Sequence, residues 1–303
     1  MLQRVIGIDV ARAIALLAMM AAHLTTTGAF VEGIGGELLY GFPSALFAFL
    51  AGMSMSLMAR TAGTLKFCVR AAVLIAFHVL LLPFSGDIAI VLFPMGISMI
   101  VLSVPVSWSS RSLALLFLAL CVVSAVINQF EVEPWILLGP PYPLAMWAAL
   151  MTAGILAQRH LRAYAVAALS GGVVAAAVLA ARWYYLPPDG WDWLDPNGHT
   201  GGLLDVAGSV GMSVAVLSIC CLIYSRLGRS PILQAFGSMS MTIYVLHVLT
   251  ADYLGFTSTA IGAIVFAVVW KHFFQRGPLE AFTRWVVNRA VTRRSESADQ
   301  PRR

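Results

Sequence analysis

Three polar side chains at the start of the chain, in an otherwise apolar stretch, have types and a spacing that could support chemistry: Asp9, Arg12 and His23. Arg12 and His23 are eleven positions apart and, at about 100° per residue, nearly eclipsed on a helix, with Asp9 within roughly 60° of both. A guanidinium can bind phosphate or a developing oxyanion, and a neutral imidazole can accept a proton near neutral pH. These residues therefore form one polar stripe on a predicted helix.

The helix must also place the two ends of this stripe at different depths. At about 1.5 Å per residue, Arg12 and His23 are about 16 Å apart along the axis, so they cannot hydrogen-bond directly. A charge in hydrocarbon is costly and usually functional. We predict two sites along one polar cavity, one toward each side of a membrane.

Two other interpretations of this first stretch compete with the cavity. A cleavable signal peptide would use Arg4 and Arg12 as its basic region and Ala13 to Ala22 as its core, but Asp9 does not suit such a region. An Asp9–Arg12 pair could instead be structural, with His23 as an interfacial residue. We favour the functional cavity.

The composition indicates a polytopic membrane protein. Of 303 residues, 60% are hydrophobic and 11% are charged, and the mean hydropathy is +0.85, whereas a soluble domain carries about 25% charged residues. The net charge of +5 is dispersed over short loops and the C-terminus, which does not indicate a nucleic-acid partner. The four cysteines lie in or beside apolar runs without ligand spacing, so we expect no metal site.

Apolar segments of 17–25 residues indicate membrane spans. Spans in lipid must satisfy their own backbone hydrogen bonds, which helices do, and short connections between them predict a helical bundle. We predict an all-α fold of about ten transmembrane helices in one domain, residues 1–275. A basic cytoplasmic tail, residues 276–303, is expected to be helical and membrane-associated over Gly277 to Val291 and disordered from Ser295. The predicted spans lie near 5–24, 38–58, 67–83, 88–106, 112–129, 137–157, 163–183, 205–225, 232–250 and 256–274.

The charges between these spans alternate and predict the orientation, because positive residues favour cytoplasmic loops. With both termini in the cytoplasm, Arg12 lies toward the cytoplasmic half and His23 at the far end of the first helix. The cytoplasmic loops and the N-terminus then hold Arg4, Arg60, Lys66, Arg70, Arg111, Arg159, Arg162, Arg226 and Arg229. The outer loops hold Glu32, Glu37, Asp87, Glu131, Glu133, Asp189, Asp192, Asp195, Asp205 and Asp252, with Arg182 as a basic exception.

Two later stretches add candidate binding residues. The longest outer connection, residues 183–205, is rich in aromatic and turn-forming residues, and its polar groups nearest the next helix include His199 and Asp205. Such a loop suits a lid or an acceptor-binding surface, although a solvated aromatic anchor is an equal alternative. The ninth span is more polar than its neighbours, and its Tyr244 and His247 could line the same cavity as His23.

Several of these stretches resemble a known superfamily, the membrane-bound acyltransferases that move acyl groups across bilayers. The first helix, IDVARAIALLAMMAAH, has the Arg-x10-His spacing of the acyltransferase-3 family, at Arg12 and His23. Other stretches resemble the branch of heparan-α-glucosaminide N-acetyltransferase and its YeiB-like bacterial relatives. These are GFPSALFAFLAGMSMSL, HTGGLLDVAGSVGMSVAVLSICCLI, SPILQAFGSMSMTIYVLH and FFQRGPLEAFTRWV. The Tyr-Val-Leu-His within the third is closer to acyltransferase-3, so the branch that sets the mechanism stays open.

The resemblance implies transfer of an acyl group, in particular acetyl, from cytoplasmic acyl-CoA to a hydroxyl or amine. The acceptor would be an extracytoplasmic glycan, lipid or metabolite. His23 would act as base or acyl carrier, Arg12 as the donor-binding electrophile, and Asp9 would orient and neutralise Arg12.

Weaker assignments complete the predicted site. His199 and Asp205 would handle the acceptor, Tyr244 and His247 would line the substrate cavity, and Glu280 would hold the donor entrance together with Arg276. The protein would lie among the lipids of a prokaryotic plasma membrane as a multi-pass protein, with a homodimer left open. A transporter or flippase that uses the same polar stripe, and a non-catalytic scaffold, are the competing functions.

Overall fold

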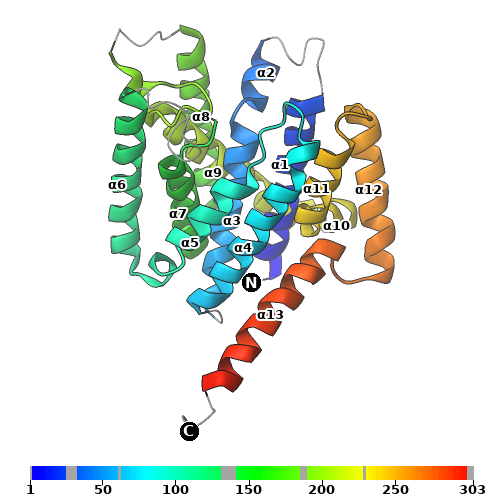
Figure 1. Cartoon of the computed structure of the whole chain (residues 1–303). Coiled ribbons are helices and arrows are strands. Elements are labelled where there is room, and N and C mark those ends of the chain that lie inside the picture. The colour runs from blue at the N-terminus through cyan, green and yellow to red at the C-terminus, as the bar shows by residue number, and fades with distance from the viewer. Residues whose placement is uncertain are drawn as a thin grey trace.

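The computed structural model describes residues 2–24, 33–60, 63–130, 141–184, 190–227 and 230–298. Within these ranges every regular element is a helix and no strand occurs (Figure 1), which confirms the predicted all-α class for this part of the chain. The α-helices are α1 (Leu2–Leu24), α2 (Ile34–Leu39), α3 (Phe42–Met58), α4 (Thr64–Leu81), α5 (Leu92–Val101), α6 (Ser110–Gln129), α7 (Leu144–His160), α8 (Tyr164–Tyr184), α9 (Leu203–Leu227), α10 (Pro231–Ser238), α11 (Ser240–Thr250), α12 (Phe256–Phe273) and α13 (Pro278–Ala298). Short 3₁₀ turns are η1 (Leu82–Phe84), η2 (Pro105–Ser107) and η3 (Asp192–Leu194).

Seven of the ten predicted spans coincide with helices that are long and apolar enough to cross a membrane. The length and composition of the described helices are consistent with a multi-pass membrane protein. These segments are Ile6–Leu24, Gly35–Met58, Thr64–Phe84, Ser110–Gln129, Tyr164–Tyr184, Leu203–Arg226 and Phe256–Phe273. The described residues do not confirm the predicted count of ten, because the other three segments do not contain one long apolar helix each.

Two of those three segments contain shorter helices. Within the predicted span 88–106, α5 covers only Leu92–Val101, and a 3₁₀ turn begins at Pro105, whose ring removes the backbone N–H that a continuing helix needs. Within the predicted span 137–157, α7 begins after Pro143, and residues 137–140 lie outside the described part of the chain. Apolar composition alone does not distinguish a short buried helix from a complete span.

The third segment, predicted as the span 232–250, is broken. Helices α10 and α11 meet at Met239 with a bend of 76°, and the backbone of Met239 is not helical, with φ −111° and ψ 30°. If this pair counts as one span, the described residues contain up to eight spans. The break brings the N-terminus of α11 into the interior of the bundle, beside α1 and α13.

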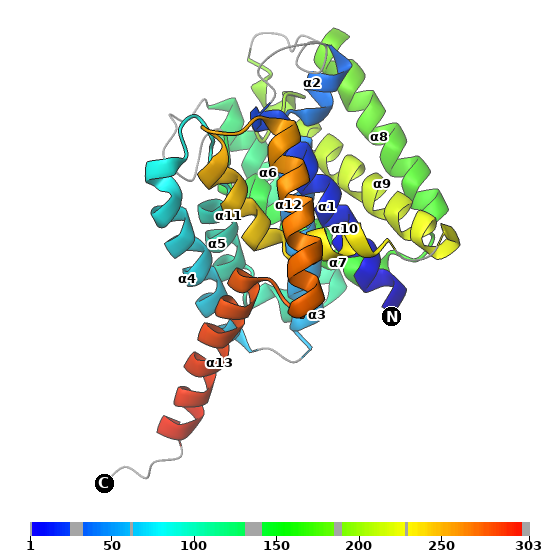
Figure 2. The same cartoon turned by 90° about the vertical axis from the view of Figure 1, so that its right-hand side faces the viewer.

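Close helix packing places α1 at the centre of the bundle, against α3, α9 and α10 (Figures 1 and 2). Glycines allow the closest approaches. A Cβ at Gly237 of α10 would collide with the Asp9 carbonyl of α1, and a Cβ at Gly52 of α3 would collide with the Met151 carbonyl of α7. Small residues serve this purpose in membrane helices, where van der Waals packing replaces the hydrophobic effect.

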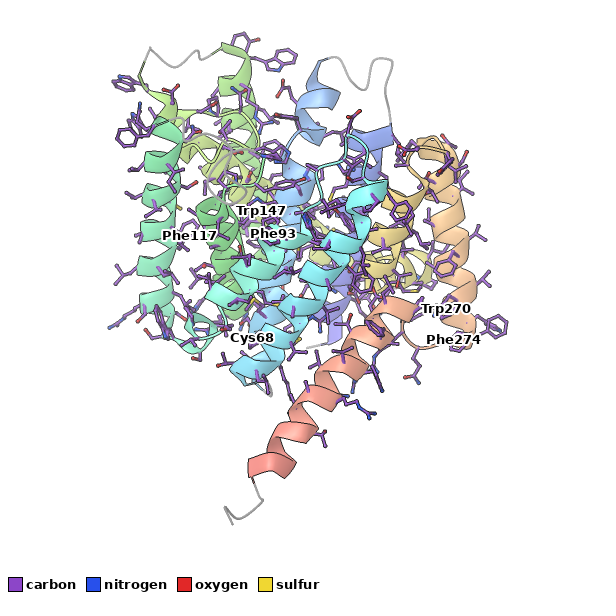
Figure 3. All side chains as sticks on the ribbon, viewed as in Figure 1. Cys68, Phe93, Phe117, Trp147, Trp270 and Phe274 are labelled. Carbon is purple, nitrogen blue, oxygen red and sulfur yellow. The ribbon has the colours of Figure 1, made fainter. Side chains whose placement is uncertain are left out.

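The outer helices expose apolar side chains, as lipid-facing helices should. Leu115 on α6 and Leu169 on α8 are among the many exposed aliphatic residues. At the end of α12, the rings of Trp270 and Phe274 stack with centroids 4.5 Å apart and lie at the periphery of the molecule (Figure 3).

The C-terminal helix α13 extends away from the bundle on the side where α1 begins (Figures 1 and 2). It runs from Pro278 to Ala298 and therefore continues past Ser295, where the sequence predicted that disorder begins. Residues 299–303 lie outside the described part of the chain.

Candidate functional site

Arg12 faces a cavity of about 170 Å³ in the half of the bundle where α1 begins. We call it the Arg12 cavity. It is lined by Arg12, Phe47, Ala51, Ser54, Met55, Met58, Arg70, Leu74, Leu92, Met95, Met99, Ser238, Ser240, Met241, Tyr244, Glu280 and Thr283. Its walls thus combine two guanidinium groups and one carboxylate with a flexible, methionine-rich apolar surface.

The guanidinium of Arg12 is held on two sides. Its Nη1 donates to Asp9 Oδ1 at 2.8 Å, and its Nη2 donates to Ser54 Oγ on α3. Ser54 Oγ in turn donates to the carbonyl of Leu50 at 2.7 Å. The predicted pairing of Asp9 with Arg12 is therefore present, while Asp9 itself is not part of the cavity lining. A guanidinium fixed in this way is preorganised to bind an anion.

Glu280 lies in the same cavity but has a different partner from the one predicted. Its Oε1 accepts hydrogen bonds from the backbone N–H groups of Met241 at 2.8 Å and Thr242 at 3.1 Å, and its Oε2 accepts one from Thr242 Oγ1 at 2.6 Å. The carboxylate therefore caps the positive N-terminus of α11. Arg276 contributes only its carbonyl, which accepts from Trp270 Nε1 at 2.8 Å. A Cβ at Gly277 would collide with the Glu280 carboxylate, which explains the glycine there.

Arg70 is a site residue that the sequence does not predict. The charge pattern assigns it to a cytoplasmic loop, but it lies within α4, lines the Arg12 cavity and donates from Nη1 to Met58 Sδ at 3.7 Å. Its position inside the apolar segment 67–83 could have revealed it, because a charged residue within a span, like Arg12, is expected to face a cavity or a partner.

His23 faces a second cavity, of about 280 Å³, near the other end of α1. We call it the His23 cavity. It is lined by Met19, Ala22, His23, Leu39, Tyr40, Gly41, Pro43, Ser44, Asp87, Ala89, Val91, Pro141, Tyr142, His199 and Tyr244. His199, which is predicted to handle the acceptor, and Tyr244, which is predicted to line the substrate cavity, both lie in the wall of this cavity together with His23. The lining also includes Tyr40 and Tyr142, which the sequence analysis did not single out.

His23 forms a close pair with His247 of α11. Nδ1 of His23 lies 3.1 Å from Nε2 of His247, and the two rings are nearly parallel, with an interplanar angle of 9°. His247 is 1% exposed, and its Nδ1 lies 3.1 Å from the carbonyl oxygen of Tyr244. The sequence predicted that His247 lines the same cavity as His23. The structure corrects this: His247 contacts His23 from behind and lies outside the lining of the His23 cavity.

His199 lies in the loop before α9, with a left-handed backbone at φ 69°. Its ring packs edge-on against Tyr40 and Tyr142, with centroid distances of 5.2 Å and 5.3 Å. Burial lowers the pKa of His199 to about 4, so the imidazole is neutral at physiological pH. Burial likewise raises the pKa of Tyr142, whose Oη donates to the carbonyl of Ala89 at 2.9 Å. This part of the cavity wall is therefore uncharged.

Asp205 supports this wall from behind rather than facing the cavity. Its side chain is fully buried, accepts from the backbone N–H of Gly201 at 3.2 Å, and lies 3.9 Å from Arg182. Arg182 donates to the carbonyls of Glu37 at 2.9 Å and Tyr40 at 3.1 Å. The assignment of Asp205 to the acceptor is therefore not supported by its position, because its carboxylate turns toward Arg182. Arg182, the one basic residue in the predicted acidic outer loops, therefore has a buried side chain with a structural role.

Tyr244 separates the two cavities and lines both. It is 1% exposed, and its Oη accepts a hydrogen bond from the backbone N–H of Val91 at 3.1 Å. The sequence predicted one continuous polar cavity from Arg12 to His23. The structure has two cavities with one tyrosine side chain in common, because the bend at Met239 directs α11 between them.

Residues 150–256 match a family model described as a protein of unknown function (DUF418). This is the YeiB-like family of the sequence resemblance, and the match identifies neither an acyltransferase nor a specific branch. The matched segment contains His199, Tyr244 and His247, but neither Arg12 nor His23. No curated protein matches the chain.

Proposed function

We propose that this protein is a membrane-embedded acyltransferase. It moves an acyl group, in particular acetyl, from acyl-CoA in the Arg12 cavity to a hydroxyl or amine in the His23 cavity. The observation that carries this proposal is that Arg12 and His23, on one helix, line two cavities that have Tyr244 as a common wall. Acyl-CoA is the donor in the cytoplasm, and the acceptor is an extracytoplasmic glycan, lipid or metabolite. The membrane is the plasma membrane of a prokaryote, and both termini are cytoplasmic.

The Arg12 cavity suits an anionic donor with an apolar, flexible arm. Arg12 and Arg70 supply positive charge, and guanidinium groups bind phosphate oxygens in a bidentate geometry. The methionine side chains Met55, Met95 and Met99 adapt their shape and can pack against a pantetheine arm and its acyl group. The positive residues of the predicted cytoplasmic loops support an orientation in which this cavity faces the side where acyl-CoA is available.

The His23 cavity suits an uncharged acceptor group. His23 supplies the imidazole, while His199 and the three tyrosines of the lining supply neutral polar and aromatic surface. In the reaction, the acceptor oxygen or nitrogen forms a bond with the thioester carbonyl carbon, and His23 takes the acceptor proton. The C–S bond then breaks, and the CoA thiolate takes that proton to leave as free CoA.

A second route uses His23 as an acyl carrier. The imidazole nitrogen attacks the thioester and CoA leaves as the thiol, after which the acceptor attacks the acyl-imidazole and regenerates His23. Both routes require the thioester to reach His23 past Tyr244. They differ in a single observable, which is acyl label on the protein when no acceptor is present.

Transfer of label from radioactive acetyl-CoA tests the proposal. Purified protein in nanodiscs is incubated with labelled acetyl-CoA and a crude envelope fraction as the source of acceptor. We expect label in the acceptor fraction, no transfer by His23→Ala, and normal transfer by His160→Ala. His160 is a matched control, because it lies at the end of α7 and contacts Ser110 rather than either cavity. No CoA-dependent transfer by the wild-type protein would refute the proposal.

A transporter or flippase is the second candidate, and the bend between α10 and α11 is the observation that favours it. Broken helices near the bilayer centre form substrate sites in many transporters, usually as a pair in two related halves. Among the described residues only this one bent pair passes as a span, so the acyltransferase remains our first proposal. Uptake of a solute or lipid by proteoliposomes without any dependence on CoA would favour the transporter.

A further inference from the structure

We infer that His247 is a positioning residue that fixes the tautomer of His23, so that Nε2 of His23 is the nitrogen that reacts. This inference deepens the proposed function and rests on it for its chemical meaning. It depends on two consecutive contacts in the interior of the bundle, which run from the carbonyl of Tyr244 through the ring of His247 to the ring of His23.

The first contact determines the proton on His247. Nδ1 of His247 lies 3.1 Å from the carbonyl oxygen of Tyr244, one turn earlier in α11. A carbonyl oxygen can only accept a hydrogen bond, so the proton must be on Nδ1 of His247. In a neutral imidazole the other nitrogen, Nε2, then carries a lone pair and can only accept.

The ring of His247 is neutral for a physical reason. His247 is 1% exposed, and no carboxylate of the described residues forms an ion pair with it. Burying an unpaired imidazolium would be very costly. The ring contacts are with His23 and Tyr244, neither of which supplies a negative charge.

The second contact then determines the proton on His23. Nε2 of His247 accepts, so Nδ1 of His23, 3.1 Å away, must donate. Nε2 of neutral His23 therefore carries the lone pair. Nδ1 is directed at His247 in the interior, so Nε2 is the nitrogen that remains for a ligand in the His23 cavity.

This arrangement supports the chemical step. When the acceptor attacks the thioester, its proton moves to Nε2 of His23, the C–S bond breaks, and the CoA thiolate finally takes the proton. While His23 is protonated, its Nδ1–H still donates to His247, which stabilises the positive charge. An imidazole held in the other tautomer would present N–H to the acceptor and could not act as a base.

Nitrogen-15 NMR of the full-length protein, labelled at histidine and reconstituted in nanodiscs, tests the tautomer directly. The signal of His23 is identified by its loss in His23→Gln. We expect the Nδ1–H form in the wild-type protein and in His247→Gln, because the side-chain carbonyl of glutamine can still accept from Nδ1–H. We expect that form to be lost in His247→Leu. The Nε2–H form of His23 in the wild-type protein would overturn the inference.

Kinetics with labelled acetyl-CoA give the second readout. We expect His247→Leu to lower kcat by about 10²-fold with an unchanged KM for acetyl-CoA, and His247→Gln to recover most of this loss. His160→Gln serves as the control. Equal loss of kcat in His247→Gln and His247→Leu would show a merely structural role and overturn the inference. The NMR experiment needs no activity, so the expected tautomer in a protein that transfers no acyl group counts against the proposed function alone.

Discussion

The two cavities share one helix and one tyrosine, yet they differ in how they treat charge. In the Arg12 cavity, charged groups are present: Arg12 is held by Asp9 and Ser54, Glu280 caps the N-terminus of α11, and Arg70 donates to Met58 Sδ. In the His23 cavity, the histidines are held by neutral groups, and Asp87 is the formally charged residue among its described lining. The difference shows that the bundle separates an ion-binding environment from one suited to proton transfer.

This separation has a physical basis. A charge inside a membrane protein must be compensated by a partner, and a compensated guanidinium can still attract an anionic ligand. An imidazole that acts as a base must instead be neutral, which an uncharged surrounding favours. Removal of His23 should therefore affect chemistry, and removal of Arg12 should affect donor binding.

The largest effect expected from this comparison is that of His23→Ala. Loss of a general base typically lowers kcat by about 10²–10⁴-fold, while binding of free CoA should be unchanged because the His23 cavity is separate from the Arg12 cavity. Label transfer measures the first quantity and calorimetry with CoA measures the second. Weaker CoA binding by His23→Ala, equal to that of an Arg12 variant, would contradict the division into two sites.

The pH dependence of stability should include a contribution from His199 in the wall of the His23 cavity. Folding lowers the pKa of His199 from 6.5 to about 4. This difference changes the free energy of unfolding by at most about 3 kcal/mol. Between these values the unfolded chain binds a proton that the folded chain does not, so stability should fall as the pH is lowered from 6.5 to 4. Thermal unfolding in detergent at several pH values measures this trend.

The matched variants for this experiment are His199→Asn and His160→Asn. Asparagine tolerates the left-handed backbone at position 199, so the first variant should fold and show a weaker loss of stability in acid. His160 is exposed at the end of α7, and its replacement should leave the trend as it is. An unchanged trend in His199→Asn would show that another group carries it.

Arg12→Gln should weaken binding of CoA by about 10–100-fold, because a charge-assisted hydrogen bond contributes about 1.5–3 kcal/mol. The change leaves Asp9 without its cation, so the double variant Asp9→Asn, Arg12→Gln separates lost stability from lost binding. Calorimetry with CoA measures the affinity. The double variant should bind as weakly as the single one, and recovery of binding in it would assign the effect to Asp9.

Glu280→Gln should give the smallest effect, a loss of about 1 kcal/mol in stability. The amide keeps the shape of the side chain but removes the negative charge at the N-terminus of α11. Thermal unfolding is the measurement, with the exposed Arg284→Gln on the same helix as the control. An unfolding temperature equal to that of the control would show that the charge of Glu280 is not needed there.

Much of the site could be predicted from the first helix. The 3.6-residue period placed Asp9, Arg12 and His23 on one stripe, and Asp9 does contact Arg12. The polarity of the segment around His247 also indicated that this residue faces protein or water, but the sequence predicted it in the cavity wall, whereas it contacts His23 from behind. Arg70 could have been found by the same rule.

Other features could not be derived from local pattern. Hydropathy counted the segment 232–250 as one span, whereas the structure bends by 76° between α10 and α11, and Gly237 of α10 packs closely against α1. Asp205 was placed at the acceptor because it lies near His199 in the chain. Its carboxylate instead compensates Arg182, a partner from another helix that sequence distance does not reveal.

The sequence by itself determined two features. Its apolar runs require helices that lie in lipid, and the eleven-residue spacing requires Arg12 and His23 to share one face of a helix at different depths. Only the tertiary structure decided that this stripe opens into two cavities instead of one. The cause is the broken helix pair, which inserts Tyr244 between them and places His247 behind His23. Helix periodicity acts within one segment, whereas the shape of a cavity depends on which side chains other segments bring to it.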